Sequence, residues 1–266
     1  MRKCGALIHA SWLAVSSYRL GMVLSFGSLL LAVVPVYFVA NALQPTMATV
    51  IRGEGHQYFG FLIVGMMVLS VVTATLYALP NAITTGTSNG TLEALFATPT
   101  PIAVLLTGLA GYEVLFALVR ALVLLLAAAA IGTHVAWDRV AQATPILLLL
   151  IFAHIPFGLA AGAMILAFRT IGPLPQVTLL LSTFLGGAYY PTRVIPGWIE
   201  KVSDILPMTY GLRALRRVLL EGMTLRDVLR DVGILAAFAA ILMVASALAF
   251  RAALQYAKRV GTLAQY

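Results

Sequence analysis

Charged residues are scarce in this sequence. Asp, Glu, Lys and Arg make up 10% of its 266 residues, whereas soluble domains carry roughly 25%. Hydrophobic residues make up 61%, and the mean hydropathy is +0.99. Such a chain has too little polar surface to face water on all sides, which excludes a soluble domain held by a single anchor. The composition predicts an integral membrane protein along the whole chain.

Residues that catalyse reactions are also scarce. The chain has nine Asp and Glu and four His, with no HExxH pair, phosphate-binding GxxxxGK[ST] loop or GxSxG elbow. An intramembrane enzyme normally needs clustered carboxylates or histidines, or a nucleophile beside a base. The histidines lie far apart in the sequence, at His9, His56, His134 and His154. We therefore expect no catalytic site, and if ATP drives this protein, another chain hydrolyses it.

A single cysteine, Cys4, excludes an internal disulfide and a cysteine-based metal site. We expect neither a metal site nor a cofactor in this chain. The net charge of +8 does not indicate a nucleic-acid partner, because the 17 Lys and Arg are scattered between apolar runs. In a membrane protein such residues set orientation or contact anionic headgroups of the lipid bilayer.

Apolar runs of ~20 residues, long enough to cross a bilayer, recur along the chain. They predict an all-α membrane protein, a single domain over residues 1–266 with about six transmembrane helices. Residues 1–21 have Ile8, Trp12 and Val15 at helical spacing, which predicts an interfacial helix rather than a signal peptide. The expected spans are about Met22–Ala42, Phe59–Leu79, Ile102–Ile131, Pro145–Phe168, Pro173–Tyr190 and Val232–Phe250.

An even number of spans places both termini on one side of the membrane. Basic residues near both ends favour the cytoplasm under the positive-inside rule. The segment from Arg193 to Asp231 would then lie outside, although it holds seven Lys and Arg against five Asp and Glu. Either the number of spans is odd, or this segment is a folded element that escapes the rule, and we favour the second. The basic residues near the ends are Arg2, Lys3, Arg19, Arg251, Lys258 and Arg259.

Three polar residues lie within apolar spans. Glu113 and Arg120 are seven residues apart and share a helix face, and His154 stands two residues before Pro156. Intramembrane ionisable groups often mark function. The alternative, which we favour, places Glu113 near the cytoplasmic headgroups and pairs Arg120 and His154 with neighbouring helices.

A polar segment, residues 80–101, separates the second and third spans. Asn89-Gly90 is a turn signal, and Glu93 suits the first turn of a helix. Leu92, Leu95 and Phe96 form a small apolar face, and Pro99 and Pro101 end the helix. This pattern predicts a two-turn amphipathic helix in a cytoplasmic loop; a plain interfacial linker is the alternative.

The segment 186–230 alternates glycine, proline and aromatic residues, which suits neither a continuous span nor a plain loop. Within it, residues 208–220 are amphipathic, and Thr224 with Asp227 forms a capping box before the last helix. We expect two short helices that dip into the outer leaflet, since hydrocarbon requires an internally satisfied backbone. A structural cap between two spans is the alternative. Leucines 212, 215 and 219 are expected on the apolar side, and Arg213, Arg216 and Arg217 on the polar side.

Together these segments resemble the type-2 ABC exporter permeases, a family that includes drug, polysaccharide and glycolipid exporters. The order and spacing of the matching motifs are more specific than any one of them, and the tail 259–266 also resembles a subset of the family. The matching residues are Gly90 to Leu95 with Thr98-Pro99, Gly187 to Pro191, Pro196 with Trp198, and Pro207 with Thr209, Tyr210 and Arg213.

The resemblance implies an inner-membrane permease of a prokaryote that pairs with a separate ABC ATPase subunit, which binds the ATP and Mg, and with a second copy of itself. The first and fifth spans would line the dimer interface and pathway. The coupling helix that contacts the ATPase would use Gly90, Thr91, Leu92, Glu93, Leu95, Phe96 and Thr98. The re-entrant segment would use Gly187, Tyr190, Pro191, Pro196, Trp198, Pro207, Tyr210 and Arg213.

One feature departs from the family pattern. Relatives often carry charged residues just before the coupling helix, whereas this chain has only Thr and Ser hydroxyls and Asn89 there. Two other classes of function stay open at this point. One is a standalone membrane enzyme or secondary transporter that uses Glu113, Arg120 and His154, and the other is a membrane scaffold that transports nothing.

Overall fold

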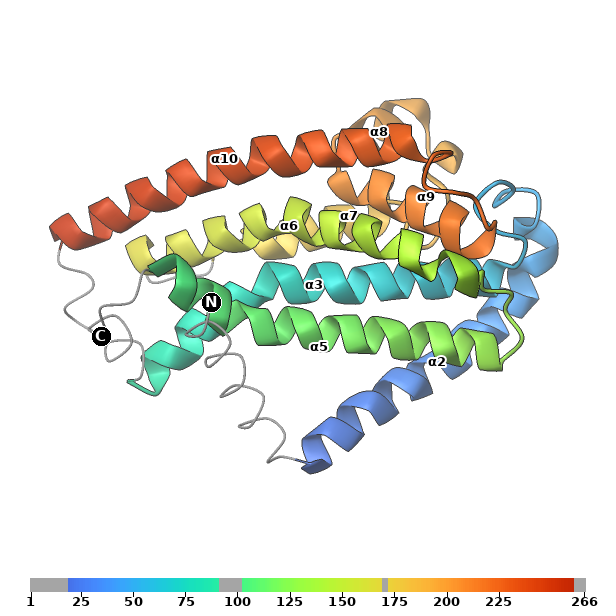
Figure 1. Ribbon diagram of the computed structural model, residues 1–266, viewed down its shortest axis with the longest axis horizontal. Helices are drawn as coiled ribbons and strands as arrows, with labels where there is room; N and C mark the ends of the chain where they lie inside the picture. Colours follow the sequence, from blue (N-terminus) through green and yellow to red (C-terminus); the bar gives the residue numbers. More distant parts are fainter. Residues whose placement is uncertain (1–18, 91–101, 169–171, 261–266) are drawn as a thin grey trace.

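The computed structural model describes residues 19–90, 102–168 and 172–260, and within these ranges it contains eight α-helices, two short 3₁₀ helices and no strand. Five of the helices are long and apolar enough to cross a membrane. They are α2 (Arg19–Met47), α3 (Tyr58–Ser88), α5 (Ile102–Ala130), α6 (Val140–Phe168) and α10 (Leu229–Val260) (Figure 1). The expected all-α membrane fold is confirmed for these five; residues 1–18, with most of the expected interfacial helix, lie outside the described ranges.

The fifth expected span is wrong in its length. We predicted a helix up to Tyr190, but α7 covers only Leu174–Leu185. Twelve residues give a helix of about 18 Å, well short of a hydrocarbon core of about 30 Å. The backbone leaves the helix at Gly186, and Gly187 follows with φ of +83°. The described bundle therefore has five long helices and one short one.

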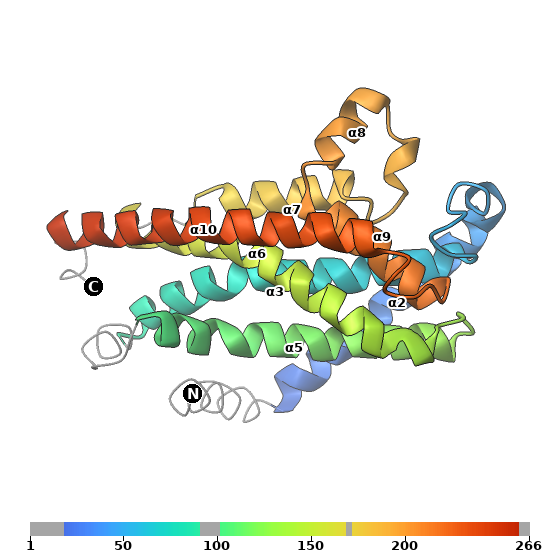
Figure 2. The same cartoon turned by 45° about the horizontal axis from the view of Figure 1, so that its top comes forward.

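The second expected span ends later than predicted. The sequence predicts an end at Leu79, just before Pro80, but α3 continues through Pro80 to Ser88. The polar residues beyond the proline bind the helix's own carbonyls: Thr84 Oγ1 donates to Pro80 at 2.9 Å, and Ser88 Oγ donates to Thr84 at 2.9 Å. Proline cannot donate a ladder hydrogen bond, and α3 changes direction toward its C-terminal end (Figures 1 and 2). Residues 80–88 therefore belong to a bent helix, not to a loop.

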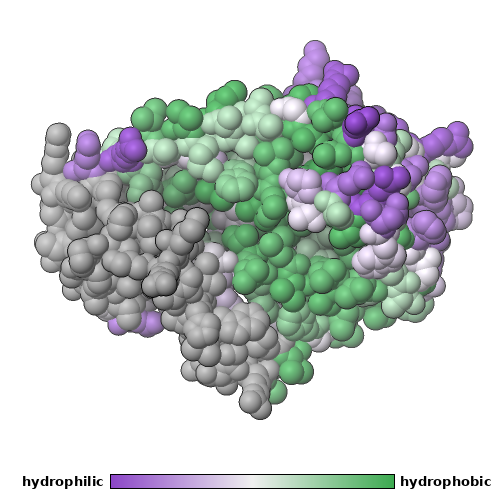
Figure 3. All heavy atoms as spheres, in the orientation of Figure 1, coloured by the Kyte–Doolittle hydropathy of each residue, from purple (hydrophilic) through white to green (hydrophobic). Residues whose placement is uncertain are grey.

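The core of the bundle is built around α3. In its most apolar stretch 78% of the residues are buried, against 11% in α2 and 17% in α10. α5, α6, α2 and α9 all pack on α3, and α10 packs on α6 and α9. The peripheral helices present large apolar side chains outward, as suits a surface in contact with lipid. Figure 3 shows this apolar surface over the middle of the molecule, with many polar residues at the right-hand end and a few beside the grey atoms at the left.

That polar end, here called the α9 end, holds the α2–α3 loop (48–57), the α5–α6 connection (131–139), α8 (Gly197–Ser203) and α9 (Pro207–Leu220) (Figure 1). The C-terminal ends of α3, α6 and α10 lie at the opposite end. The connection from α3 to α5 therefore leaves the bundle at the end where α10 finishes.

Candidate functional site

Two short helices, α8 and α9, follow α7 in the segment that we predicted to be re-entrant. Figure 2 shows α8 standing away from the bundle, while α9 lies against it. α9 begins with Pro207 at its first turn, where the missing N–H costs nothing. A Cβ on Gly211 would stand 2.5 Å from the side chain of Leu150 in α6, so this glycine lets α9 approach α6 closely.

Side chains from α8 and its flanking turns cap the C-terminal end of α7. The last carbonyls of a helix have no partner within the helix, and at membrane depth they need one inside the protein. Tyr190 Oη donates to the Phe184 carbonyl at 2.5 Å, and the Ser203 hydroxyl donates to the Leu185 carbonyl. These two hydroxyls allow α7 to end early.

Arg216 of α9 lies at the centre of this arrangement and is 1% exposed. Its Nη1 donates to the Gly187 carbonyl at 2.7 Å, and Nη2 donates to the Ala188 carbonyl at 2.8 Å. Nε and Nη2 donate to the Phe61 carbonyl of α3 at 3.2 and 3.0 Å. Nη1 also lies 3.4 Å from Glu54 Oε2 in the α2–α3 loop. These five hydrogen bonds match the five N–H donors of a guanidinium.

We predicted Arg216 on the polar side of α9 with Arg213 and Arg217, and omitted it from the site residues. The structure corrects this, because Arg216 is buried and its guanidinium lies 3.3 Å from the centre of the Phe61 ring. Arg213 and Arg217 are half-buried and approach the buried Asp231 of α10 at 3.9 and 3.5 Å. All three arginines of α9 therefore have acidic neighbours, which accounts for much of the positive charge in this segment.

Most of the other predicted residues of the segment hold its turns together. Tyr210 Oη donates to the Asp204 carbonyl at 2.9 Å, and Thr209 Oγ1 donates to the Ser203 carbonyl at 2.7 Å. Pro191 precedes a 3₁₀ turn and Pro196 precedes α8. Trp198 differs from these because it is 73% exposed on α8, as expected of a ring at a membrane interface.

Half of the predicted capping box is present at Thr224 and Asp227: the Asp227 carboxylate accepts from the Thr224 N–H, whereas the Asp227 N–H donates to the Thr224 carbonyl and not to its hydroxyl. Asp227 Oδ2 accepts hydrogen bonds from the Thr224 hydroxyl at 2.7 Å and from its N–H at 2.8 Å. These bonds hold the pKa of the Asp227 carboxyl below its ordinary value, and the bond from the hydroxyl has the larger effect. The α-helix itself begins two residues later, at Leu229.

The expected coupling helix lies outside the described residues, and only the Asn89-Gly90 turn that precedes it is described. Asn89 ends α3, and Gly90 follows with φ of +66°, a left-handed conformation that favours glycine. Nothing is described for Thr91, Leu92, Glu93, Leu95, Phe96 and Thr98. Ser88, the last residue of α3, and Ile102, the first of α5, lie at the end of the bundle opposite α9.

The intramembrane polar residues do not form a cluster. Glu113 and Arg120 of α5 are half-buried, and no ion pair joins them in the described part of the chain. The Arg120 guanidinium lies 5.2 Å from the centre of the Phe116 ring. His154 of α6 is fully buried, and its Nδ1 lies 2.8 Å from the Leu150 carbonyl of the same helix. α5 packs mainly on α3, whereas α6 packs mainly on α10 and then on α3. Among the described residues no hydrogen bond or ion pair joins His154 to Glu113 or Arg120, so the three do not form a catalytic cluster.

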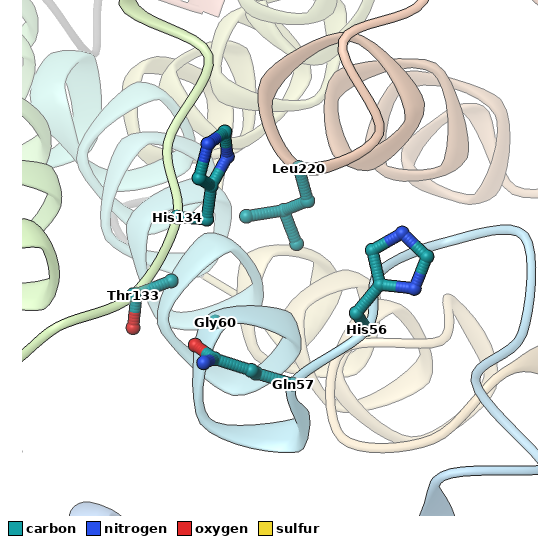
Figure 4. Close-up of a pocket in the computed structure, with 6 residues that line it drawn as sticks. All are labelled: His56, Gln57, Gly60, Thr133, His134 and Leu220. Atoms are coloured by element: carbon teal, nitrogen blue, oxygen red, sulfur yellow. The ribbon is translucent and has the colours of Figure 1, made fainter.

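A pocket of about 70 Å³ opens at the α9 end (Figure 4). His56 and His134 come from different loops and face it from two sides, and His56 Nε2 lies 3.6 Å from Glu221 Oε2. No group of three metal-binding side chains occurs among the residues that the structure describes. The pocket has room for only a few water molecules and is too small for a transported molecule. The other lining residues are Gln57, Gly60, Thr133 and Leu220.

Known proteins are similar to this chain in sequence. The chain is 25% identical over 175 residues to nodulation protein J of Sinorhizobium fredii, covering 65% of this chain and 66% of that protein. It is 24% identical over 166 residues to the inner membrane transport permease YadH of Escherichia coli, covering 61% and 63%. It is also 24% identical over 116 residues to the linearmycin resistance permease protein LnrN of Bacillus subtilis, covering 44% and 30%. The matched regions thus span just under two thirds of the first two relatives.

The family model described as ABC-2 type transporter matches residues 6–220, a range that includes the α3–α5 connection, the α7 cap and all of α9. This range is most of the chain, and it agrees with the resemblance drawn from the motifs above. The chain belongs to the ABC-2 type transporter family.

Proposed function

We propose that this chain is the transmembrane permease subunit of an ATP-driven exporter, with ATP hydrolysed by a separate ABC ATPase subunit. Membership of the ABC-2 type transporter family is the observation that carries the proposal. The absence of a phosphate-binding motif in the sequence supports a separate ATPase. In this proposal residues 90–98 are the coupling helix, and the chain itself holds neither cofactor nor metal.

The proposed location is the inner membrane of a prokaryote, with both termini in the cytoplasm and the α9 end outside. The inner-membrane relative YadH supports the location. The ion pairs of the three α9 arginines support the orientation, because they explain how a basic segment can lie outside. The re-entrant helices α8 and α9 would then sit in the outer leaflet.

A homodimer is also part of the proposal. α2 and α7 present exposed apolar side chains, among them Phe38, Val177, Leu180 and Phe184, and a second copy would cover part of them. The low charge of the spans favours an amphiphilic or apolar cargo such as a lipid-linked glycan, a lipid or a hydrophobic drug over a small ion. The relatives named for nodulation and for linearmycin resistance are compatible with such cargo.

Purification separates this proposal from a standalone enzyme or transporter. Tagged permease extracted from the native membrane should bring down an ATPase of separate sequence in stoichiometric amount. Washed free of that partner, the chain should show no ATP hydrolysis above the detergent blank. Hydrolysis by the isolated chain, in an amount that follows its concentration, would rule out the proposal.

A charge reversal at Glu93 tests the proposed coupling helix. Glu93→Arg should lower the ATPase activity of the reconstituted complex at least about tenfold, because a coupling of 1.4 kcal/mol corresponds to that factor. The matched control is Glu200→Arg, the same reversal on α8 at the α9 end, which should keep wild-type activity. Equal activity in both variants would remove Glu93 from the proposed contact.

A further inference from the structure

Arg216 joins the beginning of α3 to the turn that follows α7. Its guanidinium binds the Phe61 carbonyl in the first turn of α3, and the Gly187 and Ala188 carbonyls in the turn after α7. The two elements also touch directly, since a Cβ on Gly65 would stand 2.2 Å from the Ala188 carbonyl oxygen. The α9 arginine therefore holds α7 to α3 where their backbones already meet.

α3 runs without interruption from this contact to the opposite end of the bundle. Its 31 residues correspond to about 46 Å of helix, and its last residue, Ser88, stands two residues before Gly90. Because the backbone hydrogen bonds of a helix make it stiff, a displacement at one end of α3 reaches the other. The bend near Pro80 lies close to the Ser88 end, so the stretch from Phe61 to Leu79 is free of proline.

We propose that Arg216 is a positioning residue that couples α3 to α7 during the transport cycle. When the ATPase displaces the residues after Ser88, α3 carries the displacement to its own beginning, and Arg216 makes the end of α7 follow. This inference rests on the proposed function, because it requires that residues 90–98 contact the ATPase.

The chemistry of the side chain suits this role. A guanidinium presents its donors in a rigid planar fork, so it can bind carbonyls of two different elements at once. A lysine ammonium presents its three donors from one nitrogen on a flexible stem. Arg216→Lys should therefore keep a positive charge near Glu54. It should lose the ability to hydrogen-bond α3 and the turn after α7 at the same time.

Distances between spin labels test the coupling in the permease–ATPase complex. Cys4→Ser removes the native thiol, and paired cysteines replace exposed residues: Lys201 of α8 with Arg52, and Lys201 with Asp138. The first pair spans the contacts that Arg216 makes with Phe61 and Glu54 and that Arg193 makes with the Arg52 carbonyl, and the second measures α8 against the α5–α6 connection. An excess of unlabelled permease isolates distances within one chain. Each pair is measured without nucleotide and after trapping with Mg–ATP and orthovanadate.

In the wild-type background the Lys201–Asp138 distance should shift on trapping, while the Lys201–Arg52 distance stays narrow and unchanged. In Arg216→Lys the shift should be lost and the Lys201–Arg52 distribution should broaden. Arg217→Gln, one residue along the helix, should behave like wild type. A full shift in Arg216→Lys overturns the role of Arg216, whereas no shift even in wild type overturns the proposed coupling itself.

A second variant decides the matter if Arg216→Lys does not assemble with the ATPase. Glu54→Gln neutralises the carboxylate that lies 3.4 Å from Arg216 and leaves the side-chain shape and the backbone unchanged. It should reduce the trapping shift and broaden the Lys201–Arg52 distribution. A wild-type shift and width in Glu54→Gln would overturn the inference.

Discussion

Arg216→Met should destabilise the folded protein by about 3–5 kcal/mol, the usual cost of removing one partner from a buried ion pair. Methionine fills most of the space of the arginine stem, so little of this loss comes from an empty volume. The loss comes from the carbonyls of Gly187 and Ala188, which the guanidinium binds at 2.7 and 2.8 Å. A buried acceptor left without a partner costs about 1–3 kcal/mol.

Glu54 adds to this effect. Its side chain is 13% exposed and lies 3.4 Å from Arg216 Nη1, so removal of the arginine leaves a largely buried carboxylate without its cation. The Phe61 carbonyl is less affected, because it lies within α3 and keeps its place in the helix ladder.

Arg217→Met is the matched control for this prediction. The Arg217 side chain is 34% exposed and its Nη1 lies 3.5 Å from Asp231, so its loss should cost no more than about 1 kcal/mol. Equilibrium unfolding of both variants in the same mixed micelles would measure the difference. Two variants of equal stability would show that the Arg216 hydrogen bonds add nothing to the fold.

The long helices could be predicted from the sequence because the bilayer leaves few alternatives. An apolar run of ~20 residues must satisfy its backbone internally, and a helix does so within its own segment. For Ile102–Ala130 the predicted and observed ends differ by one residue. The ends of such a helix can therefore be predicted without knowledge of any contact between residues distant in the sequence.

The last helix also ends later than predicted, because α10 continues past Phe250 to Val260. Two other wrong helix ends depend on contacts that the local sequence does not show. Pro80 predicts a helix end at Leu79, yet α3 bends and continues, and the hydroxyls after the proline bind carbonyls of the helix. α7 was expected to continue through apolar residues to Tyr190, yet it ends early because Ser203 and Tyr190 cap its last carbonyls. Ser203 lies 18 residues after the carbonyl that it binds.

The candidate site could be predicted as a segment but not residue by residue. Glycine, proline and tyrosine residues distinguish the segment 186–230 in the sequence, and the Thr224–Asp227 pair makes one of the two contacts expected of a capping box. Arg216 could not be separated from Arg213 and Arg217, because positions i, i+3 and i+4 share a helix face. Its burial is set by Phe61, 155 residues earlier. In the sequence, the small residues Gly65, Gly187 and Ala188 are the feature that indicates a close approach of two backbones at these positions.

Gly65→Ala should destabilise the protein by about 1–3 kcal/mol, the usual cost of overpacking. The new Cβ would stand 2.2 Å from the Ala188 carbonyl oxygen and 3.1 Å from Arg216 Nη2. The obstacle is backbone rather than the end of a flexible side chain, so the turn after α7 must move off α3. Gly233→Ala on α10 is the control, because a Cβ there meets nothing within 4 Å and alanine suits a helix better than glycine.

A double-mutant cycle joins Gly65→Ala with Arg216→Met and shows whether both act on the same contact. If the alanine methyl displaces the Ala188 carbonyl, it already weakens the hydrogen bond that Arg216 makes to it at 2.8 Å. Arg216→Met then costs less free energy of unfolding in the Gly65→Ala background than in the wild type. The loss in the double variant should therefore be smaller than the sum of the two single losses by at least about 0.5 kcal/mol. If the two losses of unfolding free energy were strictly additive, Gly65 and Arg216 would stabilise different contacts. The two residues would then not both hold the turn after α7 to α3.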